Sequence, residues 1–134
     1  MKRYFLLLLI LCTLCFQSLT LVSQTLNQNE AISLATSFLQ SKINQAGDTR
    51  MLSKIVHCDL KSADEKNLYY IINFEDGGFV ILSSDQRFYP ILAYAFDGNF
   101  ETDNVPENCN TWLATWESQI LYALENENVF LETF

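Results

Sequence analysis

Histidine is almost absent from this 134-residue chain: His57 is the only one, alongside two prolines and four glycines. Acid–base and nucleophilic catalysis usually draw on histidine, and metal sites need several His, Cys or carboxylate ligands at suitable spacing. On a strand, Cys58 would point to the opposite face from His57, so the two would not act together. Glycine-rich phosphate loops and Gly-x-Ser-x-Gly motifs are also missing. These absences indicate a binding module and no enzyme, with no cofactor, no metal and no small-molecule substrate.

Basic residues are scarce as well. The chain has 8 Lys and Arg against 16 Asp and Glu, a net charge of −8. Without Lys2 and Arg3, which lie at the extreme N-terminus, 6 basic residues face 16 acidic ones, a balance of about −10. Such a surface argues against nucleic acid and anionic membrane as partners. The acidic surface either keeps the domain soluble or attracts a basic partner, and the sequence leaves both roles open.

Residues 1–23 have the three-part layout of a secretory signal peptide. A short basic head precedes the uncharged, leucine-rich stretch Tyr4–Phe16, and a more polar segment then offers Ser23 for cleavage. The apolar stretch is shorter than the ~20 residues that a membrane span needs, although an uncleaved anchor extended by Leu19–Val22 is an alternative. We therefore expect residues 24–134 to form one domain, secreted or periplasmic, that meets a membrane only through an uncleaved signal.

Two cysteines, Cys58 and Cys109, lie in this expected domain. An oxidising compartment would allow them to pair, but sequence separation does not show whether they meet. The two cysteines either form a disulfide or serve as two small buried apolar side chains, and both alternatives are open.

Two segments show the three- and four-residue apolar spacing of amphipathic helices. The first should run from about Glu30 to about Gln45, with Asn27 or Asn29 as a cap and Ala46-Gly47 at its end. The second should run from Pro106 or Asn108 to about Asn126. Its stripe includes Trp112 and Trp116, which we expect to anchor the helix on a sheet. The apolar tail Val129–Phe134 either folds back or meets a partner.

Apolar runs rich in β-branched and aromatic residues predict four strands between these helices. Glu75–Gly78 has the glycines of a tight hairpin turn, whereas Lys61–Asn67 and Phe100–Pro106 are expected to be loops. Helix, strands and helix in this order predict an α+β fold, a four-stranded antiparallel sheet with an N-terminal and a C-terminal helix packed on it. The expected strands are Met51–Leu60, Leu68–Phe74, Phe79–Leu82 and Ile91–Phe96.

A series of motifs in residues 68–100 strongly resembles the propeptide of streptopain-type cysteine peptidases. Those propeptides combine a Tyr-x-x-Asn strand, a Gly-Gly-Phe-Val-Ile strand, a Ser-x-Asp break, an Ile-Leu-x-Tyr strand and a Gly-x-Phe loop. Any one motif is weak, but all five in this order are fairly specific, and the resemblance covers nearly all of residues 24–134. The motifs here are Tyr70–Asn73, Gly77–Ile81, Ser83–Asp85, Ile91–Tyr94 and Gly98–Phe100.

The resemblance implies a free-standing propeptide, similar to Spi-type inhibitors, because the peptidase's catalytic cysteine and histidine would lie beyond residue 134. In such enzymes the propeptide keeps the peptidase inactive. The implied function is reversible, tight inhibition of a partner streptopain-type cysteine peptidase by covering its active-site cleft.

In that family the loop before the last helix crosses the cleft, and an asparagine side chain enters a substrate pocket. Asparagine offers both a donor and an acceptor. The match to the family places the inserted side chain at Asn108; its other expected role is N-capping or bonding in the first helical turn. Asn104 and Asn110 are alternatives, because this chain is one residue longer here than the streptopain pattern. The implied contact residues are Pro106, Glu107 and Asn108.

Two other functions fit the same sequence. An orphan propeptide can act as a folding assistant that templates a separately made peptidase without inhibiting it. Alternatively, the domain is a non-inhibitory secreted interaction module with no peptidase partner. Refolding yield and binding to a peptidase would separate these from the inhibitor.

Overall fold

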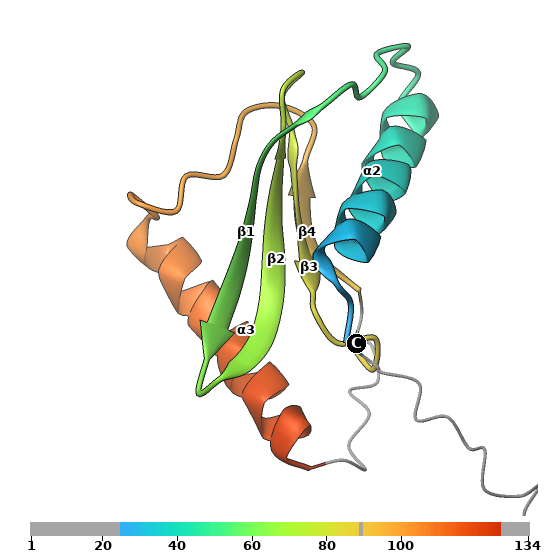
Figure 1. The fold of residues 1–134 in the computed structure, drawn as a ribbon. Helices are drawn as coiled ribbons and strands as arrows, with labels where there is room; N and C mark the ends of the chain where they lie inside the picture. The colour runs from blue at the N-terminus through green and yellow to red at the C-terminus, as the bar shows by residue number, and fades with distance from the viewer. Residues whose placement is uncertain (1–24, 89, 127–134) are drawn as a thin grey trace, which may run out of the picture.

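A four-stranded antiparallel sheet with a helix on each face forms the domain in this computed structural model, which describes residues 25–88 and 90–126 (Figure 1). The expected signal peptide and the tail Val129–Phe134 lie outside the described residues. The predicted α+β fold is confirmed. Its elements are α2 (Gln28–Gln45), β1 (Ile55–Ala63), β2 (Lys66–Phe74), β3 (Phe79–Ser83), β4 (Ile91–Ala95) and α3 (Glu107–Glu125).

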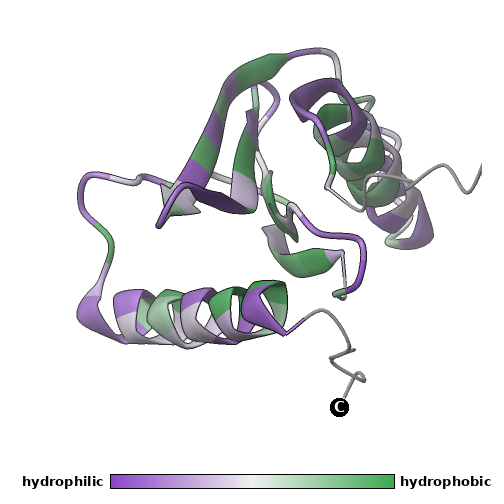
Figure 2. Cartoon of the chain, turned by 60° about the horizontal axis from the view of Figure 1, so that its bottom comes forward, coloured by the Kyte–Doolittle hydropathy of each residue, from purple (hydrophilic) through white to green (hydrophobic). Residues whose placement is uncertain are grey.

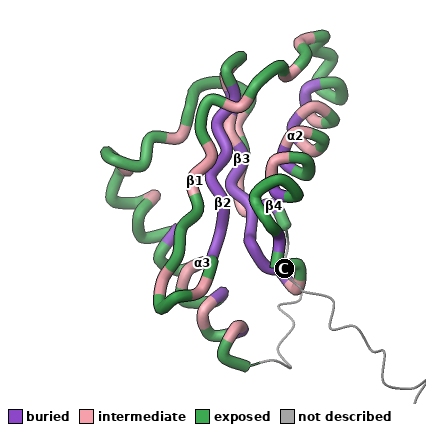
Figure 3. Tube along the Cα trace, in the orientation of Figure 1, coloured by how far each residue is buried: buried purple, intermediate pink, exposed green. Residues whose placement is uncertain are grey.

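The strands pair in sequence order, β1-β2-β3-β4, each antiparallel to the next. The two central strands, β2 and β3, are almost entirely buried, whereas most of β1 and much of α3 are exposed (Figure 3). Burial on both faces explains why β2 and β3 read as continuous apolar runs instead of alternating patterns.

The hairpin that joins β1 and β2 corrects the sequence prediction. The strand expected at Met51–Leu60 begins only at Ile55 and continues to Ala63, and the loop expected at Lys61–Asn67 is largely strand. The turn is the pair Asp64-Glu65, with φ of 50° and 61°. Two-residue hairpin turns need this left-handed backbone, which Asn or Asp followed by Gly normally supplies. Because Glu65 stands where glycine is usual, the sequence lacks the common turn pair here.

Helix α2 begins with a complete capping box. The Asn27 side chain accepts a hydrogen bond from the Glu30 backbone N–H (3.0 Å), and the Glu30 carboxylate accepts one from the Asn27 N–H (2.9 Å). The helix ends at Gln45, just before Ala46-Gly47 as expected. Leu34, expected in its apolar stripe, is 36% exposed. The side chains buried against the sheet are Ala31, Ala35, Leu39 and Ile43.

Helix α3 covers the opposite face of the sheet from α2 (Figure 2). Its buried residues are Leu113, Ile120 and Ala123. The expectation that both tryptophans anchor the helix is wrong for Trp112, which is 37% exposed and meets Trp116 edge-to-face with ring centroids 6.2 Å apart. Trp112 lies one residue, about 100° around the helix, from the buried Leu113.

The two cysteines stand on different faces of the sheet and are unpaired. Cys58 contacts the cluster under α2, and Cys109 lies in the first turn of α3. Both are half-buried. Because they are unpaired, the disulfide alternative is absent from this structure. Within the ranges 25–88 and 90–126, no helix combines the length and the apolar content that crossing a bilayer demands.

The Ser83–Asp85 motif is a buried polar corner at the end of β3. The Asp85 carboxylate is 2.8 Å from the Arg87 guanidinium and also accepts the Arg87 backbone N–H (2.9 Å). The Ser84 hydroxyl donates to the Asn67 carbonyl (2.6 Å). Buried polar groups need such partners, which gives this motif a structural role.

Candidate functional site

The expected contact residues lie where the loop 97–105 meets helix α3. Pro106 is the N-cap, with φ −56° and ψ 146°, and it provides no side-chain cap. Glu107 and Asn108 are the first two helical residues, and all three are exposed. We call Pro106, Glu107 and Asn108 the contact segment.

Asn108 bonds within the first turn of α3 and does not cap the helix. Its side-chain oxygen accepts a hydrogen bond from the Cys109 backbone N–H at 3.0 Å. In the part of the chain that the structure describes, the amide nitrogen Nδ2 has no hydrogen-bond partner, so it faces solvent as a free donor. Asn108 therefore presents an available donor at the exposed start of a helix.

The two alternative asparagines differ from it. Asn110 donates from its side chain to the Val105 carbonyl (3.0 Å), and its backbone N–H bonds the Pro106 carbonyl (2.9 Å). Asn110 thus holds the end of the loop. Asn104 is exposed within the loop, where no hydrogen bond of its side chain to another described residue is present.

The middle of the loop is fixed to the sheet by Asn73, a buried polar residue in β2 that is 5% exposed. The Asn73 side-chain amide donates to the Phe100 carbonyl (3.1 Å) and accepts from the Phe100 N–H (2.8 Å). The Phe100 ring packs edge-to-face on Phe79, with centroids 5.4 Å apart. The Tyr-x-x-Asn strand and the Gly-x-Phe loop are therefore joined directly.

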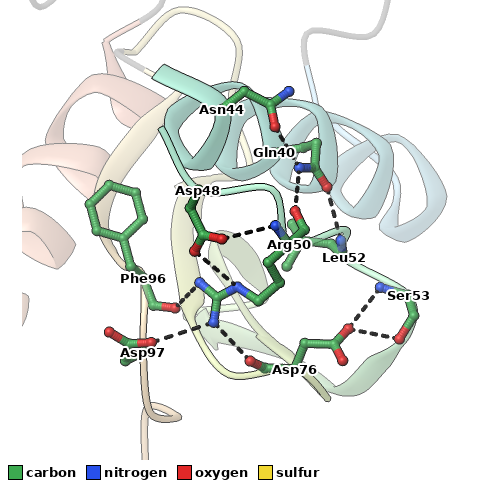
Figure 4. A network of polar contacts seen from close by, with 9 residues as sticks. All are labelled: Gln40, Asn44, Asp48, Arg50, Leu52, Ser53, Asp76, Phe96 and Asp97. Carbon is green, nitrogen blue, oxygen red and sulfur yellow. Dashed lines mark hydrogen bonds and ion pairs between the residues drawn. The ribbon is translucent and has the colours of Figure 1, made fainter. Parts of the chain in front are cut away.

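The start of the loop is held against the β2–β3 hairpin. The Gly78 N–H donates to the Gly98 carbonyl at 2.7 Å. Beside this contact, the Arg50 side chain reaches the hairpin and the end of β4 together (Figure 4). Sequence reasoning missed both Arg50 and the role of Asn73.

A cavity of about 260 Å³ lies beneath the loop and the first half of α3. On its wall the Tyr69 hydroxyl donates to the Glu117 carboxylate (2.8 Å), and Lys61 Nζ is 3.8 Å from the same carboxylate. Burial and this hydrogen bond raise the pKa of Tyr69, so its hydroxyl stays protonated and available as the donor. These contacts hold α3 on the sheet while its N-terminal end projects over the cavity.

The surface formed by residues 97–126 is acidic. It includes Asp97, Glu101, Asp103 and Glu107 but no Lys or Arg. Glu107 in the first turn of α3 is favourably placed against the positive end of the helix dipole. A partner that contacts this surface meets negative charge around the contact segment.

His57 and Cys58 are neighbours on β1, and the structure describes the surroundings of both. His57 Nε2 lies 2.8 Å from the Asp59 carboxylate on an exposed part of β1. Burial, and then the charge of Asp59, raise the pKa of the Cys58 thiol, which disfavours a nucleophilic thiolate. No three His, Cys, Asp or Glu side chains in ranges 25–88 and 90–126 gather as metal ligands do.

The structure is a small α+β domain in which residues 106–108 are exposed at the start of α3. By comparison with known families, the chain belongs to the Spi protease inhibitor family, which it matches over residues 23–120. The expected kinship with streptopain-type propeptides and Spi-type inhibitors is thereby confirmed, and with it a protease-inhibitor or propeptide-like role.

Two groups of proteases are among its relatives. The chain is 30% identical to streptopain of Streptococcus pyogenes over 109 residues, which is 80% of this chain and 26% of streptopain. It is 31% identical to the thiol protease/hemagglutinin PrtT of Porphyromonas gingivalis over 64 residues, 47% of this chain and 7% of that protein. It thus matches about a quarter or less of these relatives' lengths. No solved structure matches.

Proposed function

We propose that residues 24–134 form a secreted inhibitor that covers the active-site cleft of a streptopain-type cysteine peptidase. The observation that carries the proposal is the placement of Asn108. In a chain of the Spi protease inhibitor family, its exposed amide stands at the end of a loop that is fixed at its start, middle and end. Kinship to streptopain and to a thiol protease supports this partner class.

Among the three candidate asparagines, Asn108 is the best suited to enter a pocket. The Asn110 amide already holds the Val105 carbonyl, so its insertion into a partner would release the end of the loop. Asn104 lies in the stretch Glu101–Asn104, between the Asn73 clamp and the Asn110 clamp. Asn108 has a free donor and a helical backbone that fixes its position.

The clamps lower the entropic cost of binding. A loop that is ordered before association loses less conformational freedom when the complex forms, so more of the contact energy appears as affinity. Here the ordering comes from Gly78, Asn73 and Asn110, at hydrogen-bond distances of 2.7 to 3.1 Å. Such preorganisation suits a tight inhibitor.

The helical backbone protects the contact segment from cleavage. A cysteine peptidase attacks a backbone carbonyl with its thiolate. The Pro106 carbonyl already accepts the Asn110 N–H (2.9 Å), and the Glu107 carbonyl accepts the Thr111 hydroxyl (2.9 Å). Carbonyls held inside a helix are poorly placed for attack. We therefore expect the domain to block the cleft without being cleaved itself.

Export fits the same proposal. With residues 1–23 as a signal peptide, the domain would act in the compartment that receives the peptidase, outside the cell or in the periplasm. There it would bind the peptidase without a cofactor.

The test is inhibition of a streptopain-type peptidase by purified residues 24–134, compared with the variants Asn108→Ala and Asn104→Ala. We expect Asn108→Ala to raise the inhibition constant more than tenfold, a loss of at least ~1.4 kcal/mol, and Asn104→Ala to leave it within about threefold, or ~0.65 kcal/mol. Full potency of Asn108→Ala would remove Asn108 from the contact. Improved refolding of the peptidase without inhibition would favour the folding assistant.

A further inference from the structure

Arg50 lies in the connection between α2 and β1, yet its side chain contacts two other parts of the chain (Figure 4). Its side chain is 23% exposed, and the guanidinium spans the gap between the β2–β3 hairpin and the end of β4. It is therefore a side chain that joins three separate segments at the place where loop 97–105 begins.

The contacts of the guanidinium are directional. Nη2 donates to the Phe96 carbonyl (2.7 Å), and Nη1 donates to the Asp76 carbonyl (2.9 Å) and to the Asp97 carboxylate (3.4 Å). A planar guanidinium holds several acceptors in fixed relative positions, which the flexible, single-point ammonium of lysine does not. The geometry thus fixes the direction in which the chain leaves β4.

The Arg50 backbone is itself held in place from α2. The Gln40 side chain donates to the Arg50 carbonyl (2.9 Å) and accepts the Leu52 N–H (2.8 Å). The Asp48 carboxylate accepts the Arg50 N–H (2.9 Å). The connection that carries Arg50 is thus hydrogen-bonded to α2, and its guanidinium points toward the loop that precedes α3.

From this geometry we propose that Arg50 is a positioning residue for the inhibitory contact. It sets the exit of loop 97–105, and through the loop it places the contact segment against the peptidase cleft. The inference rests on the proposed function for its final step. Its first step, that Arg50 orders the loop, concerns the free chain alone.

If Arg50 only stabilised the fold, its loss would lower the global stability instead of affecting the loop alone. The hydrogen bonds from Arg50 to the Phe96 and Asp76 carbonyls lie in an exposed part of the structure, so water can replace its N–H donors. Loss of Arg50 should therefore change the global stability little and affect the order of the loop strongly.

The first experiment is amide hydrogen exchange of the free chain by NMR, comparing Arg50→Gln with the matched control Lys54→Gln. Lys54 lies in the same connection and makes an exposed ion pair with Glu75 at 3.7 Å. In Arg50→Gln we expect the Gly78 and Phe100 amides, which report the two loop contacts, to exchange at least tenfold faster. The buried Ile72 amide should keep its rate, and Lys54→Gln should resemble the original chain. Unchanged exchange at Gly78 and Phe100 would overturn the proposal.

The second experiment is a double-mutant cycle on inhibition, using Arg50→Gln, Asn108→Ala and the double variant. If Arg50 acts through the contact segment, Arg50→Gln raises the inhibition constant at least tenfold, and Asn108→Ala then adds less than threefold in that background. Additive effects, or full inhibition by Arg50→Gln, would contradict the positioning role. If the original chain does not inhibit, the proposed function fails, whereas the exchange result still decides whether Arg50 orders the loop.

Discussion

Asn73 and Phe100, 27 residues apart in the chain, bind each other through two hydrogen bonds of 2.8 and 3.1 Å. One amide side chain thus satisfies both backbone groups of the residue that fixes the middle of the loop. Because Asn73 is buried between apolar neighbours of β2, the pair explains why an asparagine stands inside an otherwise apolar strand.

Replacing Asn73 with leucine should destabilise the domain. The change preserves the approximate volume but leaves the Phe100 N–H and carbonyl without their partner, and each unsatisfied group costs about 1–3 kcal/mol. We expect a loss of about 2 kcal/mol or more in the free energy of unfolding, measured by urea denaturation. The matched control is Asn67→Leu in the same strand. Among the described residues the exposed Asn67 side chain bonds only Ser62, so the loss should stay below about 1 kcal/mol. Equal losses would refute the clamp.

Gly78 is predicted to tolerate no side chain. Its φ is +99°, and an added Cβ would lie 2.9 Å from both the Ala95 and the Phe96 carbonyl oxygens. Gly98 also has a positive φ, +72°, but an added Cβ there meets nothing within 4 Å. We expect Gly98→Ala to cost about 1 kcal/mol from backbone strain and Gly78→Ala about 3 kcal/mol or more from strain plus clash. Thermal or urea unfolding of the two variants would check this, and a Gly78→Ala variant as stable as Gly98→Ala would contradict it.

Asp76 should give the domain a stability term that acid removes. The Ser53 hydroxyl (2.7 Å) and the Ser53 N–H (3.0 Å) donate to its carboxylate and lower its pKa from the ordinary value of 3.8. Because the folded-state pKa lies below the unfolded one, the stabilisation is fully present above the unfolded value and disappears as pH falls through the folded value.

The measurement for Asp76 is the urea stability of the original chain and of Asp76→Asn at several pH values. We expect the original chain to be the more stable at neutral pH and the difference to shrink as the pH falls below about 4. Ser53→Ala should make the stability change less with pH, since it removes one of the two donors to the Asp76 carboxylate. A difference that stays constant down to the lowest pH would show that the charge of Asp76 is not responsible.

The parts of the fold that follow from local chemistry were predictable. Asn27, Glu30 and Gly47 carry the start and end signals of α2, and the glycines of the β2–β3 hairpin mark its turn. The Asp64-Glu65 turn was missed because Glu65 stands where such a turn normally has glycine, although aspartate is common at the first position. The exposure of Trp112 was missed because helical spacing fixes a stripe only to within about one residue.

The site was only partly predictable. The sequence and its family resemblance predicted Asn108 as the contact, which stays a prediction, but they did not predict the residues that hold the loop before it. Asn73 could have been noticed, since a polar residue inside the run Leu68–Phe74 must find a buried partner. No local pattern distinguishes Arg50, because its contacts come from segments 26 and 46 residues away. Long-range hydrogen bonds of this kind are visible only once the chain is folded.

The most direct test of cleft coverage is turnover of a small fluorogenic peptide by a streptopain-type peptidase, measured with rising amounts of residues 24–134. The substrate must be too small to be excluded by bulk alone. We expect turnover to fall to background and the apparent inhibition constant to rise linearly with substrate concentration, as for competition at one site. A peptidase that is saturated with this domain and still cleaves the peptide at its full rate would contradict the account.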